Sequence, residues 1–400
     1  MITKKKSAAF LFLASILLLI CFIFTAVTAE ALPEEIHVSD TSDIYFDPLP
    51  YVSVITEADE TVFASSSESD AGFTAKAKIM GIIPIKDIDV KVVDEIRVIP
   101  CGTPFGIKIN TKGVVVIGTG EVQTDKESLC PGEICGICPG DIIESVNGVD
   151  ISTTNELIDF VGKSKGEAIT VTVLRDGNRM SLSLTPVYST TDNTYKIGLW
   201  VRDSSIGIGT LTYIDPKSGR FGGLGHAICD SSSGVILPVG SGIITDVNLT
   251  GVRKGVSGTP GELTGFLGDR SLGYLNSNGT TGVYGVYDMP YTDSQTVAAA
   301  MKQEVKEGKA YILTTLPGKK HAEYFDIEIE KINYDDDTPT RNMVIKVTDE
   351  KLIEITGGIV QGMSGSPIIQ NGKLVGAVTH VLVNDPTRGY GIFIENMLKN

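Results

Sequence analysis

Glycine recurs at short intervals between runs of β-branched and aliphatic residues from Tyr195 to Asn400. Stretches such as GVILPVGSGIITDV (234–247) are too short and too often interrupted for helices, and they are typical of strands joined by tight turns. We expect a single helix in this region, over DSQTVAAAMKQEVKEG (293–308). The pattern therefore predicts a mostly β domain over 192–400, built as a pair of barrels or as a sandwich.

The N-terminus carries a membrane-targeting pattern. Three lysines (4–6) precede an uncharged apolar run from Ala8 to Ala29. A basic flank before an apolar run keeps the N-terminus in the cytoplasm and sends the rest of the chain across the membrane. The run is about as long as a bilayer span, yet Val27-Thr28-Ala29 offers a cleavage site, so residues 1–29 fit a signal peptide or a membrane anchor equally well.

Residues 30–87 are acidic and rich in serine, most clearly in ASSSESDAGF (64–73). Such low hydrophobicity predicts a flexible stalk that leads up to the folded domains. The formal net charge of the whole chain is −15. Because nucleic-acid binding needs clustered Lys and Arg, we expect no nucleic-acid partner.

Residues 88–188 resemble a PDZ domain. The most recognisable stretch is CPGDIIESVNGVDIS (138–152), which reads as a loop, an amphipathic stretch and an Asn-Gly turn. A capped helix over TTNELIDFVGKSKG (153–166) and a hairpin on Asp176-Gly177 follow. A PDZ domain binds a peptide as an added strand and holds its terminal carboxylate with backbone N–H groups. The resemblance implies that Pro104, Phe105, Gly106 and Ile107 form this carboxylate-binding loop, and a purely structural module is the alternative.

The strongest catalytic pattern is GGIVQGMSGSPIIQNGKLVGAVTH (357–380). Ser364 lies between Gly362 and Gly365, in a turn that is almost free of side chains, so a substrate carbonyl can approach the hydroxyl closely. The N–H groups of Gly362 and Ser364 are expected to form an oxyanion hole. A hairpin on Asn371-Gly372 follows, as in chymotrypsin-like peptidases, which the segment resembles. This resemblance implies a trypsin-like double β-barrel; Ser366, crowded by the next proline, is the rival nucleophile.

A serine nucleophile needs a base, which is usually a histidine. The chain has four histidines. His226 stands among small residues in RFGGLGHAI (220–228) and is the preferred candidate, with His380 as the alternative. The carboxylate that would orient the base is left open by the sequence, and the candidates are Asp230, Asp269, Asp288 and Asp349.

Cysteine usage does not predict a metal centre. Cys130, Cys135 and Cys138 are closely spaced, but no fourth ligand follows at a suitable distance. A local disulfide or free thiols fit this stretch better than zinc. We expect neither a metal nor a cofactor.

A PDZ segment placed before the peptidase domain, together with Gly-His-Ala-Ile at 225–228 and Gln-Gly-Met-Ser-Gly-Ser-Pro-Ile at 361–368, resembles the SpoIVB family of serine peptidases from endospore-forming bacteria. The resemblance implies His226 as base, Ser364 as nucleophile and Asp349 as acid. It also implies export into the space between the two sporulation membranes, self-cleavage, and cleavage of a regulatory membrane protein. That cleavage would release an intramembrane protease that processes a sigma factor.

Two other functions fit the same sequence. The chain could be a PDZ scaffold on an inactive peptidase fold, in which case replacing Ser364 would leave its activity unchanged. It could also be an HtrA-like quality-control protease, although those enzymes place the PDZ domain after the peptidase. The expected partners are a protein substrate at the membrane, the chain itself through self-cleavage and PDZ contact, and the membrane through the N-terminal segment.

Overall fold

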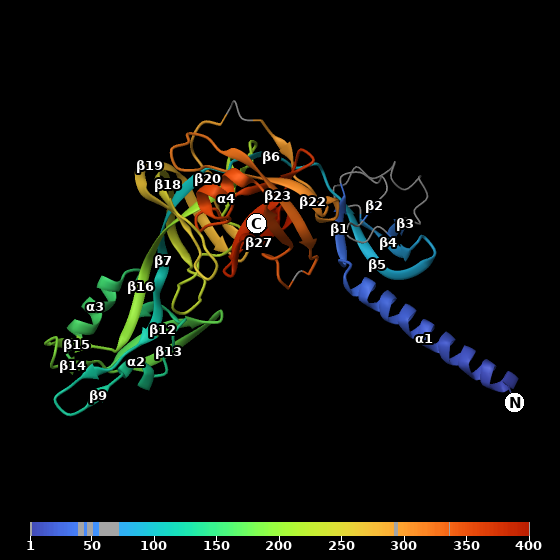
Figure 1. Cartoon of the computed structure of the whole chain (residues 1–400). Coiled ribbons are helices and arrows are strands. Elements are labelled where there is room, and N and C mark those ends of the chain that lie inside the picture. The colour runs from blue at the N-terminus through green and yellow to red at the C-terminus, as the bar shows by residue number, and fades with distance from the viewer. Residues whose placement is uncertain are drawn as a thin grey trace.

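The computed structural model describes residues 2–38, 44–45, 51–55, 72–291, 295–335 and 337–399. Figure 1 shows a long N-terminal helix, a small sheet beside its end, a central body of strands, and an arm that projects from that body. The helix, α1 (Ile2–Glu30), contains one stretch, Phe12–Glu30, that is long and apolar enough to cross a membrane. This finding fits the expected signal or anchor.

The residues after α1 form a five-stranded sheet in the order β1-β5-β4-β3-β2. Its strands are β1 (Glu35–Val38), β2 (Ile44–Tyr45), β3 (Val52–Ile55), β4 (Gly72–Ile79) and β5 (Ile83–Val92). Alternate side chains such as Ile36, Ile88 and Val90 are fully buried. The expected flexible stalk over 30–87 is therefore wrong for the described part, because period-2 apolar residues give it a core. Most of the serine-rich stretch 64–73 lies outside the described residues.

The central body consists of two six-stranded β-barrels, which confirms the expected trypsin-like double barrel. In the first barrel, the pairing β7-β18-β19-β20-β17-β16 closes because β16 also pairs with β7. Its strands are β7 (Pro104–Thr119), β16 (Leu199–Ile214), β17 (Arg220–Gly223), β18 (Val239–Arg253), β19 (Glu262–Gly279) and β20 (Gly282–Tyr287). Phe105, Leu211, Phe221 and Ile244 fill its centre. Strands β6 (Arg97–Pro100) and β21 (Val297–Ala298) extend this sheet beyond β16.

The second barrel closes in the order β22-β23-β24-β27-β26-β25. Its strands are β22 (Gly308–Thr314), β23 (Glu323–Ile332), β24 (Met343–Val347), β25 (Pro367–Gln370), β26 (Lys373–Leu382) and β27 (Asp385–Phe393). Two short helices, α4 (Glu350–Thr356) and α5 (Ile394–Leu398), pack beside them. Phe325, Ile345 and Val378 lie in its core, and the hairpin β25–β26 turns at Asn371-Gly372 as the sequence predicted.

The helix expected over 293–308 is absent from its described part. That part holds β21 and a 3₁₀ turn, η1 (Lys302–Glu304), instead. Three consecutive alanines, 298–300, are at most 8% exposed, and the Ala300 N–H donates to the Leu374 carbonyl (2.8 Å). Burial of successive residues against the second barrel overrides the helix propensity of alanine here.

The projecting arm has the PDZ elements that the sequence predicted. They include α2 (Pro131–Ile134), β10 (Ile142–Val146), β11 (Val149–Asp150), α3 (Thr154–Lys163), β12 (Ile169–Arg175) and β13 (Asn178–Leu184), with the short strands β8 (Val122–Gln123), β9 (Ser128–Leu129), β14 (Val187–Ser189) and β15 (Thr194–Lys196). The side chains of Thr153 and Glu156 form a capping box at the start of α3. Turns at Asn147-Gly148 and Asp176-Gly177 connect the expected strand pairs.

Two 16-residue strands, β7 and β16, connect the arm to the first barrel (Figure 1). They are antiparallel and pair from Thr119 opposite Leu199 to Pro104 opposite Thr210, while the last residues of β16 pair with β17 and β6. The end of β7 beyond Gly113 belongs to the PDZ core, whereas residues 104–111 complete the first barrel. The PDZ core is thus inserted between two strands of the peptidase.

This arrangement corrects the expected carboxylate-binding loop. Pro104, Phe105, Gly106 and Ile107 lie in the barrel part of β7 and pair with β16, and Gly106 and Ile107 also pair with β18. Phe105 is fully buried among barrel side chains. Because neighbouring strands occupy both edges of this segment, its backbone is not available to a peptide carboxylate.

Candidate active site

The turn that carries Ser364 lies at the junction of the two barrels and is held by β16. The Thr210 N–H donates to the Ser364 carbonyl (2.9 Å), and the Thr210 hydroxyl donates to the Gly362 carbonyl (2.7 Å). The buried Thr212 hydroxyl donates to the Gly365 carbonyl (2.8 Å). The first barrel therefore holds the carbonyls of Gly362, Ser364 and Gly365, in a turn that belongs to the second barrel.

Glycine is required on both sides of the serine. Gly362 and Gly365 both have φ of +95°, a conformation that residues with a Cβ rarely adopt. A Cβ at Gly365 would lie 2.0 Å from the Thr210 carbonyl oxygen and 2.4 Å from the Leu224 nitrogen. This close approach brings the serine turn against the segment that precedes His226.

The backbone around Ser364 leaves both expected oxyanion donors free of hydrogen bonds among the described residues. The N–H groups of Met363, Gly365 and Ser366 donate to the carbonyls of Val360, Val378 and Met363, respectively. Within the described part of the chain, no hydrogen bond uses the N–H of Gly362 or of Ser364. Two unpaired donors therefore flank the hydroxyl, which is what stabilisation of a tetrahedral oxyanion requires.

His226 lies beside this turn in the tautomer that a general base needs. Its Nδ1 is 2.9 Å from the Ala227 carbonyl oxygen, so Nδ1 carries the proton and Nε2 is left as the acceptor. Gly225 brings the chain against β26, since a Cβ there would lie 3.0 Å from the Thr379 side chain. Burial lowers the pKa of the His226 imidazole below its ordinary value, which keeps the ring neutral.

A second imidazole stands next to the first. The His226 and His380 rings are 4.8 Å apart between centroids. Burial, then the proximity of His226 and Arg341, lowers the pKa of His380 to about 4. Sequence reasoning treated these two histidines as alternatives, whereas the structure brings them together.

The serine hydroxyl is not yet directed at a base. Its Oγ donates to the Thr379 carbonyl (2.7 Å), on the residue just before His380. Rotation about the serine χ1 bond is the kind of movement that would redirect it, because side chains move readily between staggered rotamers. The structure therefore brings Ser364 next to the residue before His380, whose ring packs on His226, with the serine hydroxyl bound to a backbone carbonyl.

Asp349 is not part of this cluster in the structure. It is the N-cap of α4, where its carboxylate accepts from the Leu352 N–H (2.9 Å) and from the Asp326 N–H (3.4 Å). The contact that orients the Nδ1–H of His226 is the Ala227 carbonyl. In this structure Asp349 caps a helix, and among the described residues no hydrogen bond joins it to His226, so its expected role as the orienting acid stays a prediction.

Asp230, another candidate acid, is also engaged elsewhere. Its carboxylate forms an ion pair with Arg202 (3.1 Å) and accepts from the N–H groups of Ser232 and Ser233. Backbone and ion-pair contacts therefore account for both of these carboxylates.

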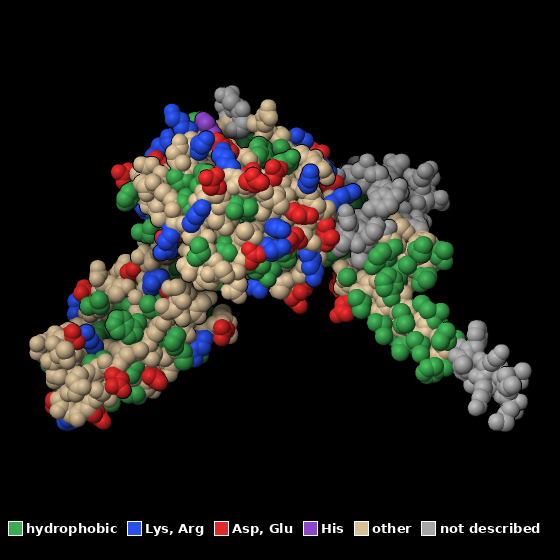
Figure 2. Space-filling model, in the orientation of Figure 1, with side chains coloured by type: hydrophobic (Ala, Val, Ile, Leu, Met, Phe, Trp, Pro, Cys, Tyr) green, Lys and Arg blue, Asp and Glu red, His purple; other side chains and the backbone are tan. Residues whose placement is uncertain are grey.

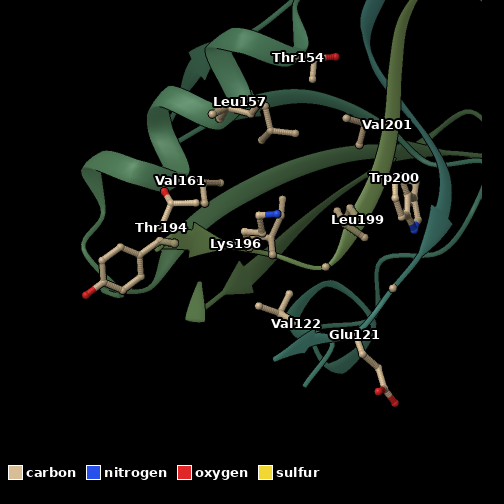
Figure 3. Close-up of a pocket in the computed structure, with 15 residues that line it drawn as sticks. Glu121, Val122, Thr154, Leu157, Val161, Thr194, Lys196, Leu199, Trp200 and Val201 are labelled. Atoms are coloured by element: carbon tan, nitrogen blue, oxygen red, sulfur yellow. The ribbon is translucent and has the colours of Figure 1, made fainter. Parts of the chain in front are cut away.

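The PDZ arm contains a groove of about 430 Å³ between α3 and the segment 194–201. In Figure 3, Leu157 and Val161 of α3 lie across from Leu199 and Val201 on that segment. Residues 199–201 pair with β7 along one edge only, and their other edge faces the helix. Gly198 has φ of +68°, and a Cβ there would meet the Gly120 carbonyl at 2.5 Å.

This groove, and not residues 104–107, has the geometry for adding a peptide strand. Sequence reasoning missed it because the segment lies after the expected PDZ boundary at residue 188. The signal was Ile197-Gly198-Leu199, a glycine between two apolar residues directly before a strand.

The cysteines add no further site. All six are free thiols, and no cluster of three or more His, Cys, Asp or Glu side chains suited to a metal occurs among the described residues.

Comparison with known families decides the assignment. The family described as SpoIVB peptidase S55 matches residues 193–398, just over half of the chain. The chain belongs to this family. It is therefore a serine peptidase, and the expected family resemblance is confirmed. A PDZ family also matches residues 129–175.

Several solved structures match parts of the chain. The PDZ domain of an SdrC-like protein from Listeria monocytogenes is 19% identical and covers 24% of this chain and 93% of its own, with a TM-score of 0.20. The active form of the Rv3671c protease from M. tuberculosis is 17% identical and covers 49% of this chain and 72% of its own, with a TM-score of 0.30. Its inactive form is 15% identical and covers 48% and 81%, with a TM-score of 0.28.

Proposed function

We propose that the chain is a serine endopeptidase in which Ser364 is the nucleophile and His226 is the general base. The observation that carries this proposal is the pair of unpaired N–H groups at Gly362 and Ser364 beside a correctly protonated imidazole. His226 Nε2 takes the hydroxyl proton as Ser364 Oγ attacks the scissile carbonyl. The two N–H groups then bind the oxyanion, and His226 returns the proton to the leaving amine. Water repeats the sequence on the acyl-enzyme and releases the acid product.

The Ala227 carbonyl takes the orienting role that a carboxylate has in many serine peptidases. A carbonyl fixes the tautomer and the ring plane, but it stabilises the imidazolium less than a full negative charge does. Burial lowers the pKa of His226, and the hydrogen bond to the Ala227 carbonyl acts in the opposite direction. His380, whose ring packs on His226, is a positioning residue that limits how the base can turn.

The proposed substrate is a membrane protein, and the proposed role is sporulation signalling. The S55 family assignment, the apolar helix α1 and the PDZ groove support this role. In this scheme the chain is exported into the space between the two sporulation membranes and cleaves itself. It then cuts a regulatory membrane protein, which frees an intramembrane protease to process a sigma factor. The groove would bind a terminus of the chain itself or of its target.

Labelling with a serine-directed phosphonate, followed by peptide mapping, tests the catalytic assignment. We expect the label on Ser364 and its loss in Ser364→Ala and His226→Ala. Ser366→Ala is the matched control, because the Ser366 hydroxyl is fully buried, has no hydrogen-bond partner and lies two residues away. Label on Ser366 would contradict the proposal and favour that serine as the nucleophile, whereas self-cleavage and substrate cleavage that are unchanged in Ser364→Ala would favour a PDZ scaffold.

A further inference from the structure

The hairpin between β4 and β5 exposes apolar side chains at a tip where polar residues are usual. Met80 and Ile82 are each 78% exposed and Ile83 is 51% exposed. The Ile82 N–H donates to the Ile79 carbonyl (3.0 Å), which closes a two-residue turn of Met80 and Gly81. Tight turns of this kind normally carry polar residues, so the composition of this tip needs a physical reason.

The backbone of the turn makes the choice of residue more unusual. Met80 has φ of +51° and Gly81 has φ of +72°, so both lie in the left-handed region. Asn-Gly is the ordinary pair for such a turn, because an unbranched apolar side chain gains nothing from this conformation. The turn therefore tolerates backbone strain in order to present a methionine at the tip.

Contacts with α1 fix the position of this tip along the helix. The Lys86 ammonium of β5 donates to the Leu32 carbonyl (2.7 Å), just beyond the end of α1. From Lys86, β5 runs back four residues to Ile82, about 13 Å at the usual rise of a strand. The tip therefore lies alongside the helix, displaced from the C-terminal end of α1 toward its N-terminus.

A second, independent contact gives the same position. The Met80 N–H donates to the Tyr51 carbonyl (2.7 Å), and the Tyr51 ring lies 5.4 Å from the ring of Phe24. Phe24 is six residues before Glu30, or about 9 Å back along the helix. Phe24 belongs to the stretch Phe12–Glu30 that is long enough to cross a membrane.

We propose that the β4–β5 hairpin dips into the outer surface of the bilayer that α1 spans. Met80, Ile82 and Ile83 would lie among the lipid acyl chains, Tyr51 at the boundary, and Lys86 at the level of the headgroups. Tyr and Lys are the residues that anchor proteins at this boundary. Figure 2 shows the apolar surface of α1 continuing onto the neighbouring sheet. The bilayer is the occupant that this continuity selects, because the patch extends the surface of a membrane-spanning helix.

The consequence is a fixed orientation of the peptidase. The sheet joins α5, beside the second barrel, through a hydrogen bond between His37 Nδ1 and the Glu395 carboxylate (2.8 Å), whose side chains are 17% and 7% exposed. A single helix would leave the catalytic domain free to rotate about its tether. Two insertions side by side would hold the domain at one height and one tilt above the membrane.

Depth-dependent fluorescence in vesicles tests this proposal on the full chain. Trp200 is the single tryptophan of the sequence, so Trp200→Phe gives a background without tryptophan emission. In that background, Ile82→Trp places a probe at the tip and Ile206→Trp places a matched probe on β16, at a side chain that is 68% exposed. The chain is reconstituted in vesicles of phosphatidylcholine and phosphatidylglycerol, with or without lipids brominated on their acyl chains.

We expect the brominated lipids to quench the Ile82→Trp emission and to leave the Ile206→Trp emission unchanged. The emission maximum of Ile82→Trp should also lie at a shorter wavelength in detergent-free vesicles than in buffer. Equal access of aqueous iodide to both probes would overturn the proposal, and so would a full chain that fails to float with the vesicles. Met80→Asn checks the turn: it should raise thermal stability in detergent, where a strain-free turn is preferred, and thermal stability that falls would contradict the strain argument.

Discussion

Replacing Thr210 by valine tests whether the first barrel holds the oxyanion turn in its active shape. Thr210 is 1% exposed, and its hydroxyl donates to the Gly362 carbonyl at 2.7 Å. Valine has almost the same shape, so the substitution removes one donor and little packing. The Gly362 carbonyl is left without that partner, while the N–H of the same residue is one of the two oxyanion donors.

The expected magnitude follows from the cost of an unpaired buried acceptor, which is about 1–3 kcal/mol. If the cost falls on the active shape of the turn alone, the population of that shape drops by about 5- to 150-fold, since each 1.36 kcal/mol is tenfold. Complete loss of one oxyanion donor costs about 10²–10³ in kcat and sets the upper limit. We therefore expect Thr210→Val to lower kcat by one to two orders of magnitude, with a smaller effect on KM.

The assay is steady-state cleavage of a peptide that contains the self-cleavage site, with thermal unfolding measured in parallel. Thr245→Val is the matched control: Thr245 is also 1% exposed in the first barrel, but its hydroxyl has no hydrogen-bond partner. That control should keep its kcat and its stability. An unchanged kcat in Thr210→Val, or an equal loss in Thr245→Val, would refute the reasoning.

Three further predictions concern the base, the helix cap and the groove. Because burial lowers the pKa of His226 below the ordinary 6.5, the acid limb of kcat/KM, where the imidazole takes a proton, should lie below pH 6.5; an acid limb at or above 6.5 would contradict this. Asp349→Asn should change kcat less than tenfold and leave thermal stability unchanged, because asparagine also caps helices well, whereas a true triad acid would cost about 10⁴ in kcat. Ile158 lines the PDZ groove and is 60% exposed, so Ile158→Asp should weaken binding of a peptide with an apolar C-terminus by about 10- to 100-fold, measured by fluorescence anisotropy; equal binding of the amidated peptide would count against a carboxylate-binding groove.

The parts of the molecule that local chemistry determines could be predicted from the sequence. The turn at Asn371-Gly372, the cap at Thr153 and the Gly-flanked serine depend on residues that are neighbours in the chain. Their conformations follow from positive φ, side-chain capping and alternation. The barrels were predicted as a class because short alternating strands can bury their apolar faces in few other ways.

The parts that depend on distant partners could not be predicted. Alanines 298–300 read as helix, but the second barrel buries all three in succession. Asp349 matched a family position, yet nothing near it in sequence reveals that His226 bonds to the carbonyl of Ala227. The segment 104–107 looked like a PDZ loop because sequence order places it before the PDZ core. Its strand in fact crosses from one core to the other.

The insertion of the PDZ core between β7 and β16 also determines which segment can be deleted without disrupting the first barrel. Asn110 of β7 lies opposite Ser204 of β16, so the two ends of the insertion meet as the arms of one hairpin. Deleting the segment between them and closing the gap with a tight turn would leave all six strands of the first barrel in place. Deleting residues 88–188 would instead remove β7 from the first barrel and unfold the peptidase domain. Loss of peptidase activity after deletion of residues 88–188 would reflect a disrupted barrel. It would give no information about peptide binding by the PDZ groove.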